Sequence, residues 1–277
     1  MSVWLAAADT ESVPACPSGC CLPVSGPLAR QMVTACTRLG DLVIDLDAAD
    51  HHVVSAALTL GCHATAIITS PGLAGVIGKM LATTHPDHDL EVADLRLTGP
   101  DTVLTAVEDL AGLAALVVAK HTCPQERRQP TRSSADPLQH NQPIALDVAK
   151  VTALLKPGGH LAVVTALRRS GRHAVDPVPN LIIEARRAGL VYLQHIVALR
   201  VPARGAPIEP TLFCGVRSRT HGQEPAGMPA STRVHSDLLI FTKPRTEPSV
   251  TSHAGTASTQ TDDPVLGEQT WVEGKQA

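Results

Sequence analysis

Aromatic residues are scarce in this chain: its 277 residues include two Trp, one Tyr and two Phe. A hydrophobic core therefore has to be built from Ala, Val, Leu and Ile, and the hydrophobic fraction of 44% supplies them amply. Stacking of bases on aromatic rings has few candidate residues anywhere in the chain, which disfavours functions that depend on it.

Long hydrophobic runs and a strong excess of either charge are absent as well. No apolar run approaches the roughly 18 residues needed to cross a bilayer. The apolar stretch at residues 3–8 has no basic region before it and no cleavage pattern after it. A net charge of −3 and a pI of about 6.5 give no global attraction to nucleic acid or acidic membranes. We therefore expect a cytoplasmic protein without a membrane partner; the sequence does not specify its oligomeric state.

A disulfide framework, a zinc motif and two nucleotide-binding motifs are also missing. The seven cysteines are odd in number and scattered, and "CPSGCC" at residues 16–21 has no second ligand pair at a suitable distance. We predict reduced thiols and no metal site. No Gly-x-Gly-x-x-Gly follows a strand and no Gly-x-x-x-x-Gly-Lys-Ser/Thr occurs, which argues against a dinucleotide oxidoreductase and a P-loop NTPase.

Changes of composition predict one domain between two tails. Residues 1–24 are rich in Pro, Ser, Ala and Cys without periodicity, and they are predicted to be flexible. Residues 244–277 are rich in Ser, Thr and Gly with little apolar content, and they are predicted to be disordered. The domain between them, residues 25–243, contains two predicted flexible loops at 123–143 and 217–232.

Short apolar runs alternate with helical patterns across this domain. The alternation predicts parallel βαβ units in an α/β fold with an open, doubly wound, mostly parallel sheet of seven strands. Towards the C-terminus two strands follow each other without a helix between them, so at least one of these strands should run antiparallel. The predicted strands are 41–46, 64–69, 90–93, 115–119, 161–166, 190–201 and 234–242, and the predicted helices begin near Pro27, Asp50, Pro71, Gly99, Pro143 and Pro177.

A resemblance to a known fold is carried by "LLKPGGHLAVVT" at residues 154–165, where a helix, a sharp turn and a buried strand follow one another. The chain resembles the Rossmann-like fold of S-adenosylmethionine (SAM)-dependent methyltransferases over residues 25–243. "SGPLARQMV", "GDLVIDLDAADHHVVSAALTLG" and "HSDLLIFTKP" are similar to bacterial DNA amino-methyltransferases, which act on N6 of adenine or N4 of cytosine. The resemblance implies an antiparallel last strand, SAM as the cofactor and DNA as a partner.

The resemblance also implies where SAM would bind, and two of the expected motifs are altered. The glycine positions of the loop after the first strand fall at Ala49 and His51, where a methyl group and an imidazole occupy space that the cofactor needs. The acid expected at the end of the second strand is replaced by Ile68. Asp45 at the end of the first strand and Asp94 after the third are the residues that could still contact the cofactor.

The expected catalytic loop, Asp/Asn/Ser-Pro-Pro-Tyr/Phe after the fourth strand, is altered too. Lys120, His121, Thr122 and Cys123 stand in its place without an aromatic residue, and none of them is assigned a catalytic role. His121 and Cys123 form a nucleophile–base pair only if a third group orients them, and the sequence does not supply one.

Clusters of histidine and arginine admit a functional and an ordinary interpretation. His51 and His52 with the neighbouring Asp47 and Asp50 suggest a metal site, but adjacent residues rarely chelate one ion, and Asp commonly caps a helix start. The arginines expected at the rim of the sheet suggest a patch for a phosphate backbone, yet such runs are usually solvated loops. These arginines are Arg127, Arg128, Arg132, Arg168, Arg169 and Arg172.

Three functions remain open from the sequence. The first is a non-catalytic methyltransferase-fold protein whose SAM and catalytic motifs have eroded, acting as a binding or partner subunit. The second is an active methyltransferase that uses Asp45 and Asp94 for SAM and modifies nucleic acid or another substrate. The third is a nucleic-acid-binding module without catalysis.

Overall fold

The computed structural model describes residues 2–5, 24–121, 146–170, 173–199 and 235–245. The predicted loops at 123–143 and 217–232 lie outside these ranges, as do residues 6–23 and 246–277 of the two predicted tails. No helix among the described residues is long and apolar enough to cross a membrane.

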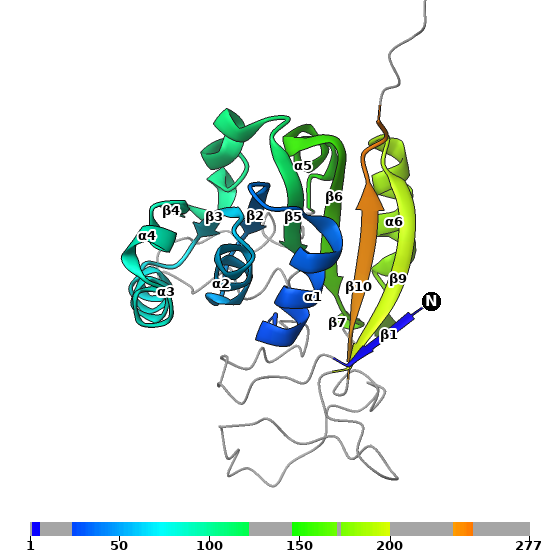
Figure 1. Ribbon diagram of the computed structural model, residues 1–277. Coiled ribbons are helices and arrows are strands. Elements are labelled where there is room, and N and C mark those ends of the chain that lie inside the picture. The colour runs from blue at the N-terminus through cyan, green and yellow to red at the C-terminus, as the bar shows by residue number, and fades with distance from the viewer. Residues whose placement is uncertain (1, 6–23, 122–145, 171–172, 200–234, 246–277) are drawn as a thin grey trace, which may run out of the picture. The chain divides into compact units, whose positions relative to one another are not determined.

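An eight-stranded mixed sheet organises the fold (Figure 1). Its strand order is β1-β9-β10-β6-β5-β2-β3-β4, and β10 is antiparallel to both of its neighbours, whereas the other neighbouring strands pair in parallel. The strands are β1 (Ser2–Leu5), β2 (Leu42–Leu46), β3 (His63–Ile68), β4 (Ala93–Leu97), β5 (Ala114–Lys120), β6 (Leu155–Thr165), β9 (Val191–Leu199) and β10 (His235–Thr242). A separate hairpin joins β7 (Arg168–Ser170) to β8 (His173–Val175).

The doubly wound α/β fold and the antiparallel last strand are confirmed, with one strand more than the seven predicted. The additional strand, β1, pairs with the edge of β9 through the register Ser2↔Ile196 to Leu5↔Leu199. It falls in residues 1–24, which the sequence pattern assigned to a flexible segment. Four residues are too few to show periodicity, and only the neighbouring strand gives them a partner.

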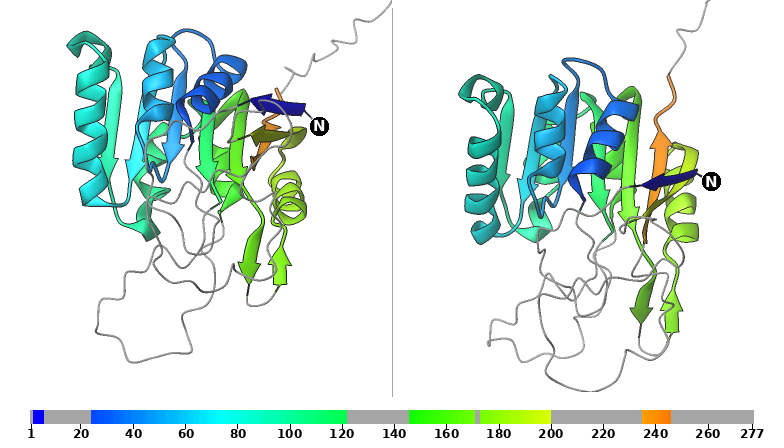
Figure 2. Two further views of the ribbon diagram at one scale, coloured as in Figure 1. Left: turned by 90° about the horizontal axis from the view of Figure 1, so that it is seen from below. Right: turned by 60° about the horizontal axis from the view of Figure 1, so that its bottom comes forward.

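Helices cover both faces of the sheet (Figures 1 and 2). One buried cluster joins α1, α2 and α3 to residues such as Val43 and Val118 of the sheet. The other joins η2, α5 and α6 to the opposite face, at residues such as Ile44 and Val117. The helices are α1 (Gly26–Cys36), α2 (His52–Thr59), α3 (Pro71–Thr84), α4 (Asp87–Leu90), η1 (Pro100–Thr102), η2 (Thr105–Leu110), α5 (Val148–Leu154) and α6 (Val178–Arg187).

Local capping explains where the helices begin. The Ser25 hydroxyl accepts from Leu28 N at 3.3 Å at the start of α1, and proline occupies the first turn of α1 and α3. The helix predicted near Pro143 begins only at Val148, because the Asp147 side chain caps it by accepting from Lys150 N at 3.1 Å. The helix predicted near Gly99 is replaced by the two short 3₁₀ segments η1 and η2.

The "KPGG" turn lies inside β6 rather than before it. Gly158 has φ +79°, a left-handed conformation that glycine adopts without strain. A Cβ on Gly159 would lie 2.7 Å from Ala114 O, so this position needs glycine for the close approach of two backbones. The turn therefore docks the start of β6 against β5 and β10.

The third predicted strand is displaced along the chain. Residues 87–90 form the short helix α4, and β4 runs from Ala93 to Leu97 instead of 90–93. Because β4 is the last strand of the sheet, its outer edge tolerates charged residues, and the apolar run that marks a buried strand is missing there. This displacement changes where Asp94 lies.

Candidate functional site

Asp45 and Lys120 come together at the carboxyl edge of the sheet. They lie at or near the ends of β2 and β5, which are parallel neighbours with the register Leu46↔Ala119. Side chains alternate between the two faces of a strand, and Val43 and Val118 both face the cluster formed with α1 and α2. Asp45 and Lys120, each two residues further on, therefore face the same side.

A buried group of three charges results. The Lys120 Nζ lies 3.8 Å from Asp45 Oδ2 and 3.8 Å from Asp50 Oδ2, and the side chains of Lys120, Asp45 and Asp50 are 4%, 0% and 9% exposed. Both Asp45 oxygens, Asp50 Oδ2 and Lys120 Nζ make no hydrogen bond within the described part of the chain. We call these three residues the Asp45–Lys120–Asp50 cluster.

Burial and mutual charge shift the pKa values in this cluster. Burial raises the pKa of Asp45 to about 7, the Lys120 ammonium opposes the rise, and Asp50 and Asp47 add to it. Burial lowers the pKa of Lys120, but the carboxylates of Asp45, Asp50 and Asp47 outweigh that effect, so its pKa is raised. Lys120 is consequently a cation at neutral pH, placed between two acids.

The loop between β2 and α2 is held by its own side chains. Asp47 has φ +61°, a conformation that Asp tolerates, and its Oδ1 accepts from Thr69 Oγ1 at 2.8 Å, which ties the ends of β2 and β3 together. Asp50 Oδ1 accepts from His52 N at 3.1 Å, in the capping role expected of an acid at a helix entrance. His51 is buried, and its ring lies 4.3 Å from that of His52.

The other residues of the altered motifs lie near this loop. Ala49 is half-buried at the loop itself, and Ile68 is fully buried as the last residue of β3. Neither offers a polar side chain. No group of three or more His, Cys, Asp or Glu residues that could hold a metal ion occurs among the described residues.

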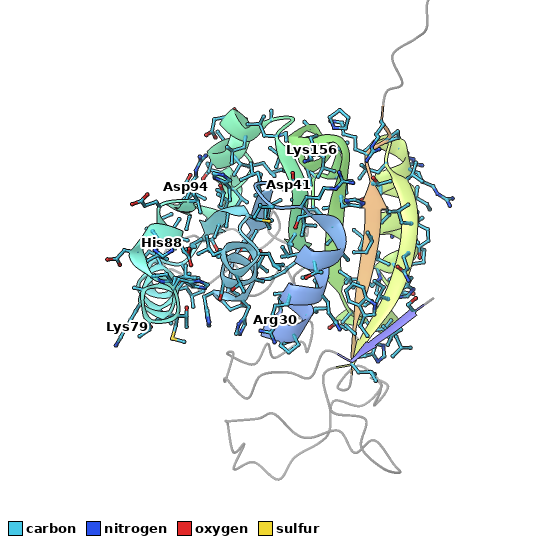
Figure 3. All side chains as sticks on the ribbon, in the orientation of Figure 1. Arg30, Asp41, Lys79, His88, Asp94 and Lys156 are labelled. Atoms are coloured by element: carbon cyan, nitrogen blue, oxygen red, sulfur yellow. The ribbon has the colours of Figure 1, made fainter. Side chains whose placement is uncertain are left out.

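Asp94 lies two strands away from Asp45 and on the other face of the sheet. It pairs with Thr65, which pairs with Ile44, so it is level with the residue before Asp45, and Figure 3 shows it well away from α1. Its Oδ2 accepts from Arg96 Nε at 2.6 Å. Asp94 therefore lies inside β4 rather than after the strand, and its contact with a cofactor stays a prediction.

The structure describes only some of the residues predicted for the catalytic loop and the arginine patch. Lys120 is the last residue of β5, and His121 N donates to Val164 O at 2.9 Å. Thr122 and Cys123 lie outside the described residues, so the His121–Cys123 pair stays a prediction. Of the predicted arginine patch, Arg168 and Arg169 lie in β7, and the other four arginines lie outside the described residues.

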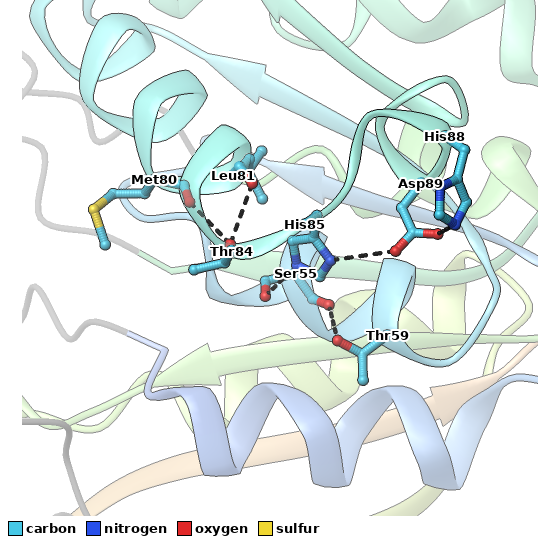
Figure 4. A network of polar contacts seen from close by, with 8 residues as sticks. All are labelled: Ser55, Thr59, Met80, Leu81, Thr84, His85, His88 and Asp89. Carbon is cyan, nitrogen blue, oxygen red and sulfur yellow. Dashed lines mark hydrogen bonds and ion pairs between the residues drawn. The ribbon is translucent and has the colours of Figure 1, made fainter.

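A second polar network joins α2 to the end of α3 (Figure 4). Ser55 Oγ lies 2.7 Å from His85 Nε2, and His85 Nδ1 lies 3.8 Å from Asp89 Oδ2. The order serine–histidine–aspartate is that of a hydrolase triad. However, Ser55 lies inside a helix, where its backbone N–H is bonded to His51 O and cannot serve an oxyanion. We therefore assign the network the role of tethering the two helices.

Sequence reasoning missed the link between Lys120 and the acids after β2. The signal is present in "DLDAAD", where one acid stands near the end of a buried strand and two more follow it, together with a lysine at the end of another buried strand. A charge at such a buried position needs an opposite charge, and neighbouring parallel strands end at the same edge. Which strands are neighbours is the information that the sequence pattern lacked.

Comparison with known proteins rests on structure alone. No protein-family model and no curated protein matches the sequence. Among solved structures, the fold is similar to the [4+2]-cyclase SpnF, with 13% identity over 88% of each chain and a TM-score of 0.50.

Two methyltransferases are further structural neighbours. One is 1,6-didemethyltoxoflavin-N1-methyltransferase of Burkholderia thailandensis, with 13% identity over 78% of this chain and 76% of that chain and a TM-score of 0.45. The other is a SAM-dependent methyltransferase of Methanosarcina mazei, with 10% identity over 78% and 98% and a TM-score of 0.45. The chain has the Rossmann-like fold of SAM-dependent methyltransferases, and identities this low show the fold alone.

Proposed function

We propose that this chain is a non-catalytic protein with a methyltransferase fold, related to the DNA amino-methyltransferases, in which a buried charge cluster has replaced the cofactor. It would act as a binding or partner subunit. The observation that carries the proposal is the Lys120 ammonium, which lies buried between Asp45 and Asp50 at the end of β2.

The described residues do not fit SAM in the position that the family resemblance implies. The loop that should be open and rich in glycine contains a buried imidazole at His51, and its Asp47 is bonded to Thr69. The Asp45 carboxylate, which the cofactor would have to reach, is fully buried beside Lys120. Separating a buried cation from its carboxylates costs on the order of 3–5 kcal/mol, which weakens binding by a factor of roughly 10² to 5 × 10³.

The first test is a calorimetric titration of the full chain with SAM and with S-adenosylhomocysteine. We expect no saturable heat up to millimolar ligand. Micromolar binding of either compound would overturn the proposal. An unchanged thermal transition of the same sample, without ligand and with it, establishes that the protein is folded and unbound.

An active methyltransferase is the second candidate, and one observation favours it. Neither oxygen of the Asp45 carboxylate has a hydrogen-bond donor within the described residues, and a bound ligand could supply one. This candidate predicts transfer of a labelled methyl group from SAM to DNA, RNA or a small molecule, and loss of transfer in Asp45→Ala. Absence of labelled product across such a panel counts against it. A methyltransferase fold by itself leaves the reaction open, since a cyclase and methyltransferases are all structural neighbours.

A partner subunit that contacts DNA would use the arginines predicted near the sheet rim. Its binding would weaken steeply with salt, and charge reversal at Arg127, Arg128 and Arg132 would flatten that dependence. Binding that is independent of salt and of these substitutions argues for a protein partner instead.

A further inference from the structure

The outer edge of β4 has backbone groups directed away from the sheet. On its inner side, Val92 O accepts from Ala64 N at 3.0 Å and Thr98 N donates to Ile68 O at 3.0 Å. Backbone groups alternate from side to side along a strand, so those of Ala93, Leu95 and Leu97 point away from β3. β4 is the last strand of the sheet formed by the described residues.

The side chains of β4 separate into an apolar face and a charged face. Leu95 and Leu97 are 37% and 56% exposed on one face, which is high for leucines in a sheet. Asp94 and Arg96 lie on the other face, where Arg96 also binds Asp109 and Ala106 O of η2. An exposed edge of this kind is a template for pairing with another strand.

The strand is self-complementary about Leu95. In an antiparallel pair centred there, Leu95 faces its own copy, Ala93 faces Leu97, and Asp94 faces Arg96 on both sides of the two-fold axis. The outward residues of the two copies then form the hydrogen-bonded pairs, with about six backbone hydrogen bonds. Asp94 and Arg96 fall at the non-hydrogen-bonded pairs, where side chains are closest, about 4.5 Å between Cα atoms.

We propose that two copies of this chain associate through β4, joining their sheets in antiparallel register centred on Leu95. The occupant is a second copy because each copy presents both the acid and the base that face their opposites on the other copy. The exposed Leu95 meets its own copy, and the exposed Leu97 meets Ala93 of the other copy.

The charges available at the edge agree with this arrangement. Asp94 keeps half of its side chain exposed although it binds Arg96. Arg96 donates four hydrogen bonds, one to Asp94, one to Ala106 O and two to Asp109, and a guanidinium has five N–H groups. One N–H of Arg96 and one side of the Asp94 carboxylate therefore remain for the opposing copy. The association does not depend on whether the charge cluster at β2 excludes SAM.

Light scattering and cross-linking test the association on the full chain. We expect about twice the mass of one chain at tens of micromolar protein. We also expect a disulfide between two copies of Leu95→Cys on mild oxidation, because facing residues of a hydrogen-bonded pair lie about 5.5 Å apart at Cα. Leu97→Cys is the matched control, since its own copies lie about 14 Å apart at Cα in this register. Mass spectrometry of the peptide that holds residue 95 distinguishes this link from those of native cysteines.

Charge substitutions test the register independently. Arg96→Asp should weaken dimerisation at least tenfold, and Asp94→Arg with Arg96→Asp should restore it, because the swapped pair again faces opposite charges. Circular dichroism of each variant verifies its fold. A chain that stays monomeric at 100 µM overturns the proposal. A dimer that forms a disulfide through Leu97→Cys but not through Leu95→Cys also overturns it. Equal weakening of the dimer by Arg96→Asp alone and by Asp94→Arg with Arg96→Asp overturns it as well.

Discussion

Asp45 and Lys120 form the most unusual pair of residues in the described part of the chain. Each is buried at the end of a parallel strand, and 3.8 Å separates the ammonium from the nearest oxygen of each acid, which is longer than a hydrogen bond. Buried ion pairs are a weak source of stability, because desolvation offsets their attraction. Removing one partner, however, leaves an uncompensated charge in the interior.

Lys120→Met should therefore destabilise the protein by about 3–5 kcal/mol at pH 8, as measured by urea unfolding. Lys150→Met is the matched control: Lys150 also lies 3.8 Å from an acid, Asp147, but both side chains are exposed, and the change should cost less than about 1 kcal/mol. Adding Asp45→Asn to Lys120→Met should recover part of the loss. Equal effects of the two lysine substitutions would contradict the buried charge cluster.

The raised pKa of Asp45 predicts a pH dependence with a definite sign. The folded protein holds the Asp45 proton up to about pH 7, whereas the unfolded chain releases it near 3.8. The retained proton of Asp45 therefore stabilises the folded state by roughly 4 kcal/mol at most. This stabilisation is fully present below pH 3.8 and is lost as the pH rises to about 7.

Asp45→Asn cannot ionise, so the free energy of unfolding of this variant minus that of the wild type should increase between pH 4 and pH 8. Urea unfolding across this range measures the difference, in which the titration of groups far from Asp45 cancels. A difference that does not change with pH would show that Asp45 titrates normally.

At the level of the secondary-structure elements, a polar contact between Ser55 and His85 links helices α2 and α3 in addition to the apolar cluster that they share. The buried His85 ring depends on Ser55 for a hydrogen bond of 2.7 Å, and Thr84 at the end of α3 bonds Met80 O at 2.9 Å. A buried ring nitrogen that loses its partner costs about 1–3 kcal/mol.

Ser55→Ala should lower the free energy of unfolding by about 1–2 kcal/mol, and Ser55→Ala with His85→Ala should reveal a coupling energy near 1 kcal/mol in a double-mutant cycle. Thr59→Ala is the control on the same helix, because Thr59 is exposed and bonds only Ser55 O. Additive effects at Ser55 and His85 would refute the tether.

At the scale of the whole molecule, two aliphatic clusters on the two faces of one sheet form the core. Phe241 is the one aromatic side chain among the largest fully buried residues of the described chain. The core of this fold therefore forms with few aromatic side chains, because Val, Leu, Ile and Ala fill both faces of a parallel sheet well. It does leave few rings for recognising a base.

The class of fold can be read from the sequence, because apolar periodicity and the positions of proline and glycine act locally. Six of the seven predicted strands and at least one antiparallel strand towards the C-terminus were predictable from such patterns, and the family resemblance implied that the last strand is the antiparallel one. The four-residue β1 and the displaced β4 were not, because edge strands lack the continuous apolar run that reveals a buried strand.

Which charged residues meet depends on how distant segments of the chain pack together. Lys120 lies 75 positions after Asp45, and their contact exists because β5 pairs directly with β2. Asp94, which was predicted to follow the third strand, lies inside β4, because α4 ends at Leu90 and the strand begins only at Ala93. Burial, and with it the shifted pKa of Asp45, follows from how the sheet and its helices pack, which no local pattern contains.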